Sequence, residues 1–293
     1  MKEKIDILFD METADPDDFL TLCFLLGHPK VNLHAITVTP GGKKQVGLVK
    51  TVLNRMNIDI PVGARTPDYT KNAVSSYYEK VLGKIPEINA DDIGWKVISD
   101  TVKKVPNITV ITGAPVTNLY ESFMNDTIKL KKWVAQGGFA GDNIVPENLR
   151  LQKFDGMLTC PTFNFNGNPK GAEFLLNTYR IKKRVLVSKN VCHGVVYTKD
   201  LHNKYYNIKD TSECTKLIYK AMDIYLKKHP NGKKLHDPLA ACTAINQNIC
   251  TFKEVKMYRR KGKWGANLDD STNTWISIGV DEDLFHKTFL YQI

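Results

Sequence analysis

Five acidic side chains lie within nine residues near the start of the chain: Asp10, Glu12, Asp15, Asp17 and Asp18. Carboxylates held this close repel one another unless a cation or shared protons compensate their charge. A hard cation with oxygen ligands would do so, and calcium or magnesium suits such ligands better than zinc. The sequence therefore predicts a cation site here. The alternative is a solvated acidic helix start, a common feature that is seldom this dense in acids.

The residues on either side of these acids indicate where they lie in a fold. Residues 5–9 form a short apolar segment typical of a buried parallel strand, and residues 19–26 form an apolar segment typical of a helix. Pro16 suits the first helical turn, where the helix dipole also stabilises acidic side chains. The carboxyl end of a strand thus meets the amino end of a helix. That junction is the usual ligand crevice of an open α/β sheet.

The rest of the chain continues this alternation of strands and helices. Strands are expected over 33–39, 60–63, 108–113, 133–139, 184–188, 255–258 and 275–280, and helices over 45–56, 94–104, 171–178, 212–228 and from 235 onward. This order predicts an α/β fold with an open, mostly parallel, doubly wound (Rossmann-like) sheet flanked by helices. No repeat or linker divides the chain, so residues 1–293 are expected to form a single domain. Residues 67–90 are polar without a clear period, and we interpret them as a surface excursion near the cleft.

Two further segments carry candidate site residues. His236 and Asp237 open an apolar helix, where a carboxylate is stabilised and a positively charged histidine is disfavoured. The alternative is that Asp237 only caps this helix. A glycine-rich loop further upstream alternates amides and aromatic rings, as at Asn143, Phe163 and Asn164. Such residues suit a pocket that bonds hydroxyls and packs rings against apolar faces, and equally a cluster of turns.

Composition narrows the classes of partner. The formal net charge of +10 raises nucleic acid as a partner, but the basic residues are scattered in short pairs without a zinc-finger or RNA-recognition signature. We therefore interpret them as a lysine-rich solvated surface, and nucleic acid is not the expected partner. No apolar run is long enough to span a membrane, and the charged amino terminus does not resemble a signal peptide.

The six cysteines form no CxxC pair and lie mostly in apolar stretches. They are expected to be reduced, buried thiols, which indicates a cytoplasmic protein. Cys192 and His193 follow the expected 184–188 strand and could reach the pocket, although a structural role is favoured for them.

Taken in order, three motifs resemble the inosine-uridine nucleoside hydrolase family: the acidic strand end, Ile-Thr-Gly-Ala-Pro-Val-Thr-Asn over 111–118, and His-Asp-Pro-Leu-Ala over 236–240. The resemblance covers nearly the whole chain. It implies the nucleoside hydrolase fold and a bound calcium ion (Ca²⁺) used to hydrolyse the N-glycosidic bond of a small-molecule ribonucleoside, in nucleoside or base salvage. Members of the family usually form homodimers or homotetramers.

The family opens with a strand followed by Asp-x-Asp-Pro-Gly-x-Asp-Asp. Asp10 and Glu12 match its first two acids, and Asp17 and Asp18 match the closing pair. The resemblance implies that the second acid binds calcium and acts as base on the attacking water. Glu12 replaces the family aspartate there, and the loop is one residue longer with Asp15 as an extra acid. Three acids therefore stay open as the metal ligand and the base: Asp10, Glu12 and Asp15.

The remaining metal and base contacts follow from the same resemblance. It implies that Asp18 is a bidentate calcium ligand and that Asp17 holds a ribose hydroxyl. Thr112 matches the threonine whose main-chain oxygen completes the metal shell, and Asp237 matches the late aspartate ligand. His236 matches the histidine that many purine-cleaving members use near the leaving base, so it is a candidate acid.

The ribose contacts are less well matched. Asn143 resembles the ribose-binding asparagine of the family's Gly-Asn loop. Thr162, Phe163 and Asn164 correspond to the later Glu-Phe-Asn motif, with threonine in place of the glutamate and the asparagine retained. Phe163 is a candidate for stacking on the base or the ribose, and core packing is the alternative for its ring.

These departures bear on the substrate more than on the reaction. The altered ribose motif and the longer loop over 147–161 suggest a base other than the common ones, for example that of a hypermodified nucleoside such as queuosine. A second hypothesis is a non-catalytic calcium- or nucleoside-binding protein, in which Glu12 no longer works as the base. A third is nucleic-acid binding through the basic surface, which would be steeply salt-dependent. We rank the hydrolase first.

Overall fold

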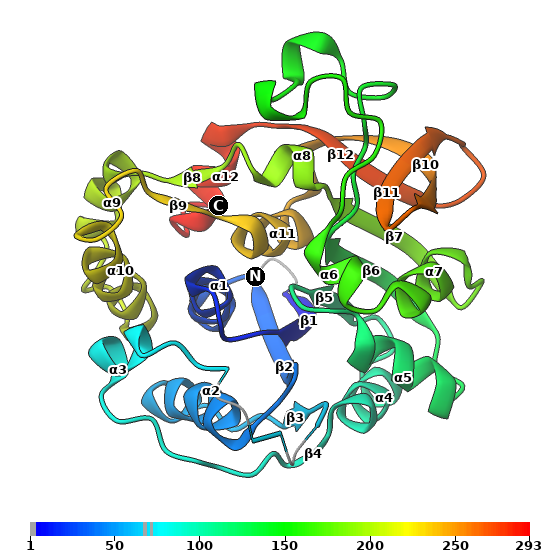
Figure 1. Ribbon diagram of the computed structural model, residues 1–293. Coiled ribbons are helices and arrows are strands. Elements are labelled where there is room, and N and C mark those ends of the chain that lie inside the picture. The colour runs from blue at the N-terminus through cyan, green and yellow to red at the C-terminus, as the bar shows by residue number, and fades with distance from the viewer. Residues whose placement is uncertain (1–3, 67–68, 71–72) are drawn as a thin grey trace.

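The computed structural model describes residues 4–66, 69–70 and 73–293. Within these residues, one sheet of ten strands forms the centre of the molecule, in the order β11-β10-β12-β7-β6-β5-β1-β2-β3-β4 (Figure 1). Neighbouring strands from β12 to β4 run parallel, whereas β10 is antiparallel to both β11 and β12. The predicted open, mostly parallel α/β sheet is therefore confirmed.

The strands of this sheet are β1 (Ile5–Met11), β2 (Val31–Val38), β3 (Val62–Ala64), β4 (Asp92–Ile93), β5 (Thr109–Thr112), β6 (Leu130–Gln136), β7 (Ile181–Val187), β10 (Cys250–Arg260), β11 (Lys263–Leu268) and β12 (Thr274–Val280). Two short strands, β8 (Val196–Tyr197) and β9 (Lys233–Lys234), pair separately. The α-helices are α1 (Pro16–Gly27), α2 (Lys43–Arg55), α3 (Tyr77–Leu82), α4 (Gly94–Lys104), α5 (Thr117–Asn125), α6 (Phe163–Gly167), α7 (Pro169–Asn177), α8 (Lys189–Cys192), α9 (Lys199–Tyr206), α10 (Glu213–Leu226), α11 (His236–Ile245) and α12 (Glu282–Phe289).

Each face of the sheet packs in its own hydrophobic core, because successive side chains of a strand point to opposite faces. In β1, Phe9 and Met11 belong to a core shared with α1, α2, α10 and α11. Leu8 belongs to the other core, which is shared with α4, α5 and α7. Helices therefore cover both faces, as the doubly wound pattern predicts (Figure 1). None of the described helices has the length and apolar character needed to cross a membrane.

The topology reverses at β1, which lies between β2 and β5. The chain leaves β1 toward β2, β3 and β4 and then returns to the other side of β1 as β5. Asp10 pairs with Thr112 across the two central strands, and the Gly113 N–H donates to the Asp10 carbonyl at 2.8 Å. Such a reversal opens a crevice at the carboxyl ends of the strands. The acidic segment that follows β1 lies at this crevice.

Several helices depart from the expected pattern, among them α6, in a segment expected to be a loop, and α8 and α9, in a segment where no helix was expected. The polar region 67–90 contains the short helix α3, while its residues 67, 68, 71 and 72 lie outside the described part. Helix α5 follows β5 where the sequence analysis expected only a turn. The carboxy-terminal part was expected to be rich in strands, which holds for β10 to β12, but it ends in helix α12.

Candidate active site

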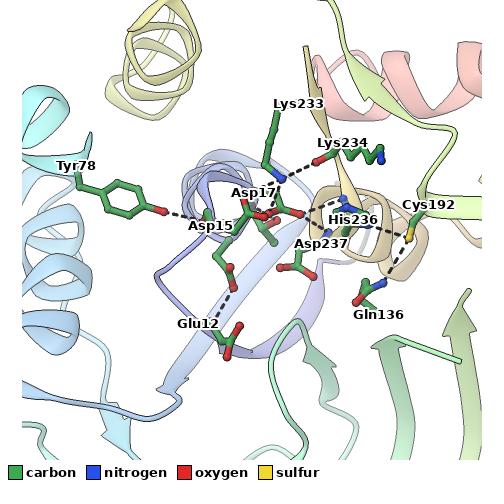
Figure 2. Close-up of polar contacts among 12 residues, drawn as sticks. Glu12, Asp15, Asp17, Tyr78, Gln136, Cys192, Lys233, Lys234, His236 and Asp237 are labelled. Carbon is green, nitrogen blue, oxygen red and sulfur yellow. Dashed lines mark hydrogen bonds and ion pairs between the residues drawn. The ribbon is translucent and has the colours of Figure 1, made fainter. Parts of the chain in front are cut away.

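Carboxylates from two helices converge at the topological reversal. Asp17 and Asp18 lie in the first turn of α1, and Asp237 lies in the first turn of α11. All three are buried, and one carboxylate oxygen from each lies within 4.8 Å of the others. Figure 2 shows Asp17 and Asp237 side by side, with Glu12 on the loop that follows β1. Oxygen atoms at this spacing could hold a hard cation.

The main chain around these acids is closely fitted. The Glu12 N–H donates to Asp18 Oδ1 at 2.8 Å, which ties the loop after β1 to the start of α1. A Cβ atom on Gly113 would lie 2.7 Å from the carboxyl carbon of Asp237, so only glycine leaves room for that carboxylate. The Asp237 side chain is therefore held against the end of β5.

The electrostatics of the cluster also favour a cation. Burial, together with Asp10, Asp15 and Asp17, raises the pKa of Glu12 to about 7. Burial and neighbouring carboxylates raise the pKa values of Asp18 and Asp237 well above their ordinary range. Protons or a cation must therefore balance the charge, and a bound cation would bring these pKa values down again. An all-oxygen donor set suits calcium or magnesium.

Asp10 lies near the end of β1, is fully buried and is not among the residues that line the pocket. Its Oδ1 accepts hydrogen bonds from Thr37 Oγ1 at 2.7 Å and from Asn118 Nδ2 at 2.8 Å, while its buried Oδ2 has no hydrogen-bond partner in the described part of the chain. Burial raises its pKa to about 7. A buried oxygen without a donor is the state expected of a carboxylate that awaits a proton or a cation.

Lys233 is a site residue that the sequence analysis missed. Its Nζ lies 2.8 Å from Asp15 Oδ1 and 3.2 Å from Asp17 Oδ1, and its side chain is only 7% exposed (Figure 2). Burial by itself would lower the pKa of Lys233, but Asp17 and Asp15 outweigh burial and raise it. The other oxygen of Asp17, Oδ2, accepts from the main-chain N–H groups of His236 at 3.1 Å and Asp237 at 3.3 Å. Asp17 is thus fixed from both sides.

These acids form one wall of a pocket of about 490 Å³. Its predicted lining residues are Glu12, Asp15, Asp17, Asp18, Thr162, Phe163, Asn164, His236 and Asp237. Ala14, Gly113, Gln136 and Lys189 also line it and were not assigned to a site from the sequence. His193 lines it as well, although a structural role was favoured for this residue. The structure therefore brings together the acidic loop, the Thr-Phe-Asn segment and the start of α11 around one space large enough for a small ligand.

The Thr162–Asn164 wall combines polar and aromatic groups. Thr162 is buried, and its hydroxyl oxygen has no hydrogen-bond partner among the described residues. Phe163 presents a ring that is 74% exposed. The Asn164 amide donates to Gln136 Oε1 at 2.8 Å and to the Gln136 carbonyl at 3.1 Å, which orients both amides at the end of β6.

Two further predicted residues lie outside the pocket lining. The Asn143 side chain is exposed, and its amide donates to the carbonyl of Ala266 in β11 at 2.8 Å. Thr112 precedes Gly113, and its hydroxyl accepts from Trp133 Nε1 at 3.0 Å. The roles expected for these two residues stay predictions.

Two imidazoles, those of His193 and His236, line the end of the pocket beside α8 and α11, and the buried thiol of Cys192 lies next to His236. Cys192 Sγ lies 3.1 Å from His236 Nδ1, and the Gln136 amide donates to the same sulfur at 3.4 Å (Figure 2). The His193 and His236 rings meet edge to face, with centroids 4.7 Å apart. Burial raises the pKa of Cys192 to about 12 and lowers that of His236 to about 4. A protonated thiol therefore faces a neutral imidazole near pH 7.

The described part of the 67–90 region lies beside the acidic loop. The Tyr78 hydroxyl donates to the Asp15 carbonyl at 2.7 Å, and the Thr13 hydroxyl donates to the Ala73 carbonyl at 3.0 Å. These contacts are consistent with the expected position near the cleft. Residues 67, 68, 71 and 72 of this region are not described.

Comparisons with known proteins agree with this architecture. Residues 7–287 match the model of the family described as inosine-uridine preferring nucleoside hydrolase. A protein of Aquifex aeolicus (strain VF5), named only as an uncharacterized protein, is 27% identical over 304 residues, which cover 97% of this chain and all of that protein.

Solved structures share the fold. A plant nucleoside hydrolase superposes with a TM-score of 0.74 at 18% identity, covering 98% of both chains. An inosine-uridine preferring nucleoside hydrolase from Bacillus anthracis gives a TM-score of 0.70 at 16% identity, covering 98% of this chain and 99% of the other. A purine-preferring ribonucleoside hydrolase from Gardnerella vaginalis gives a TM-score of 0.68 at 18% identity, covering 98% of this chain and 97% of the other.

The family match extends over nearly the whole chain, and it agrees with both the sheet order and the acidic pocket at its reversal. The expected hydrolase fold and enzyme class are therefore confirmed. The chain belongs to the inosine-uridine preferring nucleoside hydrolase family and is an N-ribosyl hydrolase of nucleosides.

Proposed function

We propose that this enzyme hydrolyses the N-glycosidic bond of a ribonucleoside in a calcium-dependent reaction that releases free base and ribose. The supporting observation is the convergence of Asp17, Asp18 and Asp237 at one end of a nucleoside-sized pocket. Asp18 and Asp237 would hold the ion, and Glu12, Asp10 and the main-chain oxygen of Thr112 are further candidate ligands. A bound calcium ion would lower the pKa of an attacking water and orient it.

Glu12 is the proposed general base. It lines the pocket, and its main-chain N–H donates to Asp18 Oδ1, so it lies beside a proposed metal ligand. It would take a proton from the attacking water. Asp15 also lines the pocket but is engaged by Lys233, and Asp10 is enclosed by Thr37 and Asn118. These contacts favour Glu12 over the other two acids.

Asp17 is the proposed ribose anchor. Two main-chain N–H groups and Lys233 hold its carboxylate in place. Little conformational entropy is therefore lost when a ribose hydroxyl donates a hydrogen bond to this carboxylate. Thr162, Phe163 and Asn164 would contact the ribose and the base from the opposite wall. The surrounding carboxylates would stabilise the positive charge that develops on the ribosyl ring as the bond breaks.

His236 is the proposed partner of the leaving base. The protonated Cys192 thiol faces Nδ1 at 3.1 Å, and a hydrogen bond donated by that thiol leaves the imidazole proton on Nε2. Nε2–H could then donate to a ring nitrogen of the departing base.

The test is base release by wild type and Glu12→Gln, with calcium present and with chelator. Glu12→Gln is expected to lose about 10²-fold or more in kcat, the usual contribution of a general base. Glu147→Gln, an exposed glutamate in the loop beyond the pocket, is the matched control and should keep wild-type activity. Undiminished turnover by Glu12→Gln would reject Glu12 as the base.

A hypermodified nucleoside such as queuosine is the second candidate substrate. Thr162 in place of the family glutamate and the long 147–161 loop support it. Preference for inosine or uridine over queuosine in competition would exclude it. A role in nucleoside or base salvage follows from the products of either reaction.

A further inference from the structure

Three lysines surround the histidine end of the pocket. Lys153 Nζ contacts His193 Nδ1, Lys189 lines the pocket, and Lys234 adjoins both Lys153 and His193 closely enough to influence their protonation. We call Lys153, Lys189 and Lys234 the lysine rim. Among the described residues, none of the three forms an ion pair with a carboxylate. Within the described part of the chain, no carboxylate therefore contacts any of these three ammonium groups.

The lysine rim makes this end of the pocket electropositive. Cys192, His193 and His236 offer ligand atoms within 4.8 Å of one another, the spacing of a soft-metal site. The three ammonium groups nevertheless oppose the arrival of a further cation at that position. The same field attracts an anion, whose charge would be shared among several donors.

A second polar group faces the same space. Lys189 Nζ donates to the Pro161 carbonyl at 2.9 Å, which places the ammonium group next to Thr162. Thr162 lines the pocket, and its buried hydroxyl has no described hydrogen-bond partner. A buried hydroxyl of this kind is normally satisfied by a ligand or a water. An anionic oxygen bound at this wall would lie beside the charge of Lys189 and next to Thr162.

The pocket thus has two ends of opposite charge: the carboxylates of α1 and α11 at one end and the lysine rim at the other. We propose that the preferred substrate is an anionic ribonucleoside, whose ribose diol lies at the acidic end and whose negatively charged group lies at the lysine rim. A carboxylate on the base and a 5′-phosphate are the two sources of such a charge. This inference rests on the proposed function, because the reaction places the ribose at the acidic end.

The test compares kcat/KM for uridine, 5-carboxyuridine and uridine 5′-monophosphate, which share one base and one ribose. We expect at least one anionic compound to exceed uridine by about tenfold, and the advantage to shrink at high ionic strength. Preference for 5-carboxyuridine assigns the lysine rim to the base, and preference for the monophosphate assigns it to the 5′ end. Uridine equal to or better than both anions would overturn the proposal while leaving the proposed function intact.

Variants of the lysine rim separate its role from general stability. Lys153→Gln and Lys189→Gln should each lower the ratio of anionic to neutral kcat/KM by about threefold, a share of the tenfold preference, since each removes one lysine charge that would face the bound anion. Lys170→Gln, on the exposed face of α7, is the control and should leave this ratio and both rates unchanged. A ratio that is insensitive to both rim variants would contradict the proposal.

Absence of any turnover would count against the proposed function rather than against the anion preference. In that case calorimetric dissociation constants for uridine and uridine 5′-monophosphate decide the inference. Binding of the monophosphate that is at least tenfold tighter, and that weakens in Lys189→Gln, would support the lysine rim. Equal binding of the two compounds would overturn it.

Discussion

Replacing Lys233 by methionine should destabilise the enzyme, even though lysine is ordinarily a surface residue. Lys233 Nζ lies 3.2 Å from Asp17 Oδ1, and both side chains are almost completely buried. Methionine keeps most of the length and apolar stem of the lysine but removes its charge. The buried Asp17 carboxylate then loses its only ion-pair partner among the described residues, while Asp15 can still turn to solvent because it is largely exposed.

The size of this effect follows from the burial of the pair. Removing one partner of a buried ion pair costs about 3–5 kcal/mol, because the remaining charge is left uncompensated. Asp17 keeps two main-chain hydrogen bonds through Oδ2, so we expect the lower end, about 3 kcal/mol. With an unfolding entropy of about 2.1 cal/mol/K per residue, that loss corresponds to a fall in Tm of roughly 5 °C for a chain of this length.

Thermal and urea unfolding of wild type and Lys233→Met measure the loss of unfolding free energy. Both proteins are kept in chelator so that no cation compensates the charge of Asp17. Lys234→Met is the matched control, because Lys234 is the next residue, is exposed and makes no ion pair within the described chain. The double variant Lys233→Met/Asp17→Asn removes both charges and should recover most of the loss. The reasoning is refuted if Lys233→Met is no less stable than Lys234→Met, or if the double variant recovers nothing.

Three further predictions address the metal cradle, the pH dependence of stability and the aromatic wall. Gly113→Ala places a Cβ 2.7 Å from the Asp237 carboxyl carbon, so calorimetry should show a large loss of calcium affinity, while Gly194→Ala, whose Cβ would meet only ordinary contacts, should not. His28 is 2% exposed, and burial, with a smaller effect of Lys30, lowers its pKa from 6.5 to about 4. Between pH 6.5 and about pH 4 the unfolded state therefore binds more protons at His28 than the folded state does. The unfolding free energy that His28 contributes above pH 6.5 is lost as the pH falls through this range. The loss is about 2 kcal/mol by pH 5. Urea unfolding of His28→Leu between pH 7 and pH 5 should not show this decrease in unfolding free energy. Phe163→Ala removes an exposed ring from the pocket wall and should raise KM by roughly tenfold, the worth of stacking on one base, without lowering Tm.

A different result in each of these three experiments would contradict the corresponding prediction. Equal calcium affinity in the two glycine variants would mean that Asp237 does not need its observed position. Parallel pH-stability curves for wild type and His28→Leu would mean that His28 is protonated in the folded protein. An unchanged KM in Phe163→Ala would place the base away from that ring.

The positions of most strands along the chain were predictable because buried parallel strands are short apolar runs. The strand expected over 133–139 is β6, but it begins at Leu130 and ends at Gln136. The three residues beyond Gln136 looked like strand because Phe139 is apolar. Gly138 instead adopts φ +80°, and Phe139 packs under the loop that follows β6.

The missed helices carried local signals that were overlooked. In α12, Asp281 accepts a hydrogen bond from the Leu284 N–H at 2.9 Å as an N-cap, and Phe285 and Phe289 are buried four residues apart. An aspartate followed by apolar residues at helical spacing is a recognisable helix start. These residues were instead counted with the strand-rich carboxy-terminal part because they directly follow strand β12.

Part of the site could not be read from local sequence at all. Nothing in Asn-Gly-Lys-Lys-Leu-His-Asp distinguishes Lys233, which is buried against Asp17, from the exposed Lys234. Only the packing of α11 against the start of α1 makes the difference, and that packing is tertiary. The acidic loop was accessible from the sequence because a dense group of carboxylates has few structural explanations. Asp237 was accessible because it opens an apolar helix and matches the late aspartate of the family that the sequence resembles.

The central claim is metal-dependent hydrolysis at the carboxylates of α1 and α11, and one measurement tests it most directly. That measurement is release of free base from inosine, uridine, adenosine, cytidine and queuosine by wild type and Asp237→Ala, with calcium present and with chelator. The account predicts turnover of at least one nucleoside by wild type with calcium, and its loss on chelation and in Asp237→Ala. Turnover that persists in chelator and in Asp237→Ala would contradict the account.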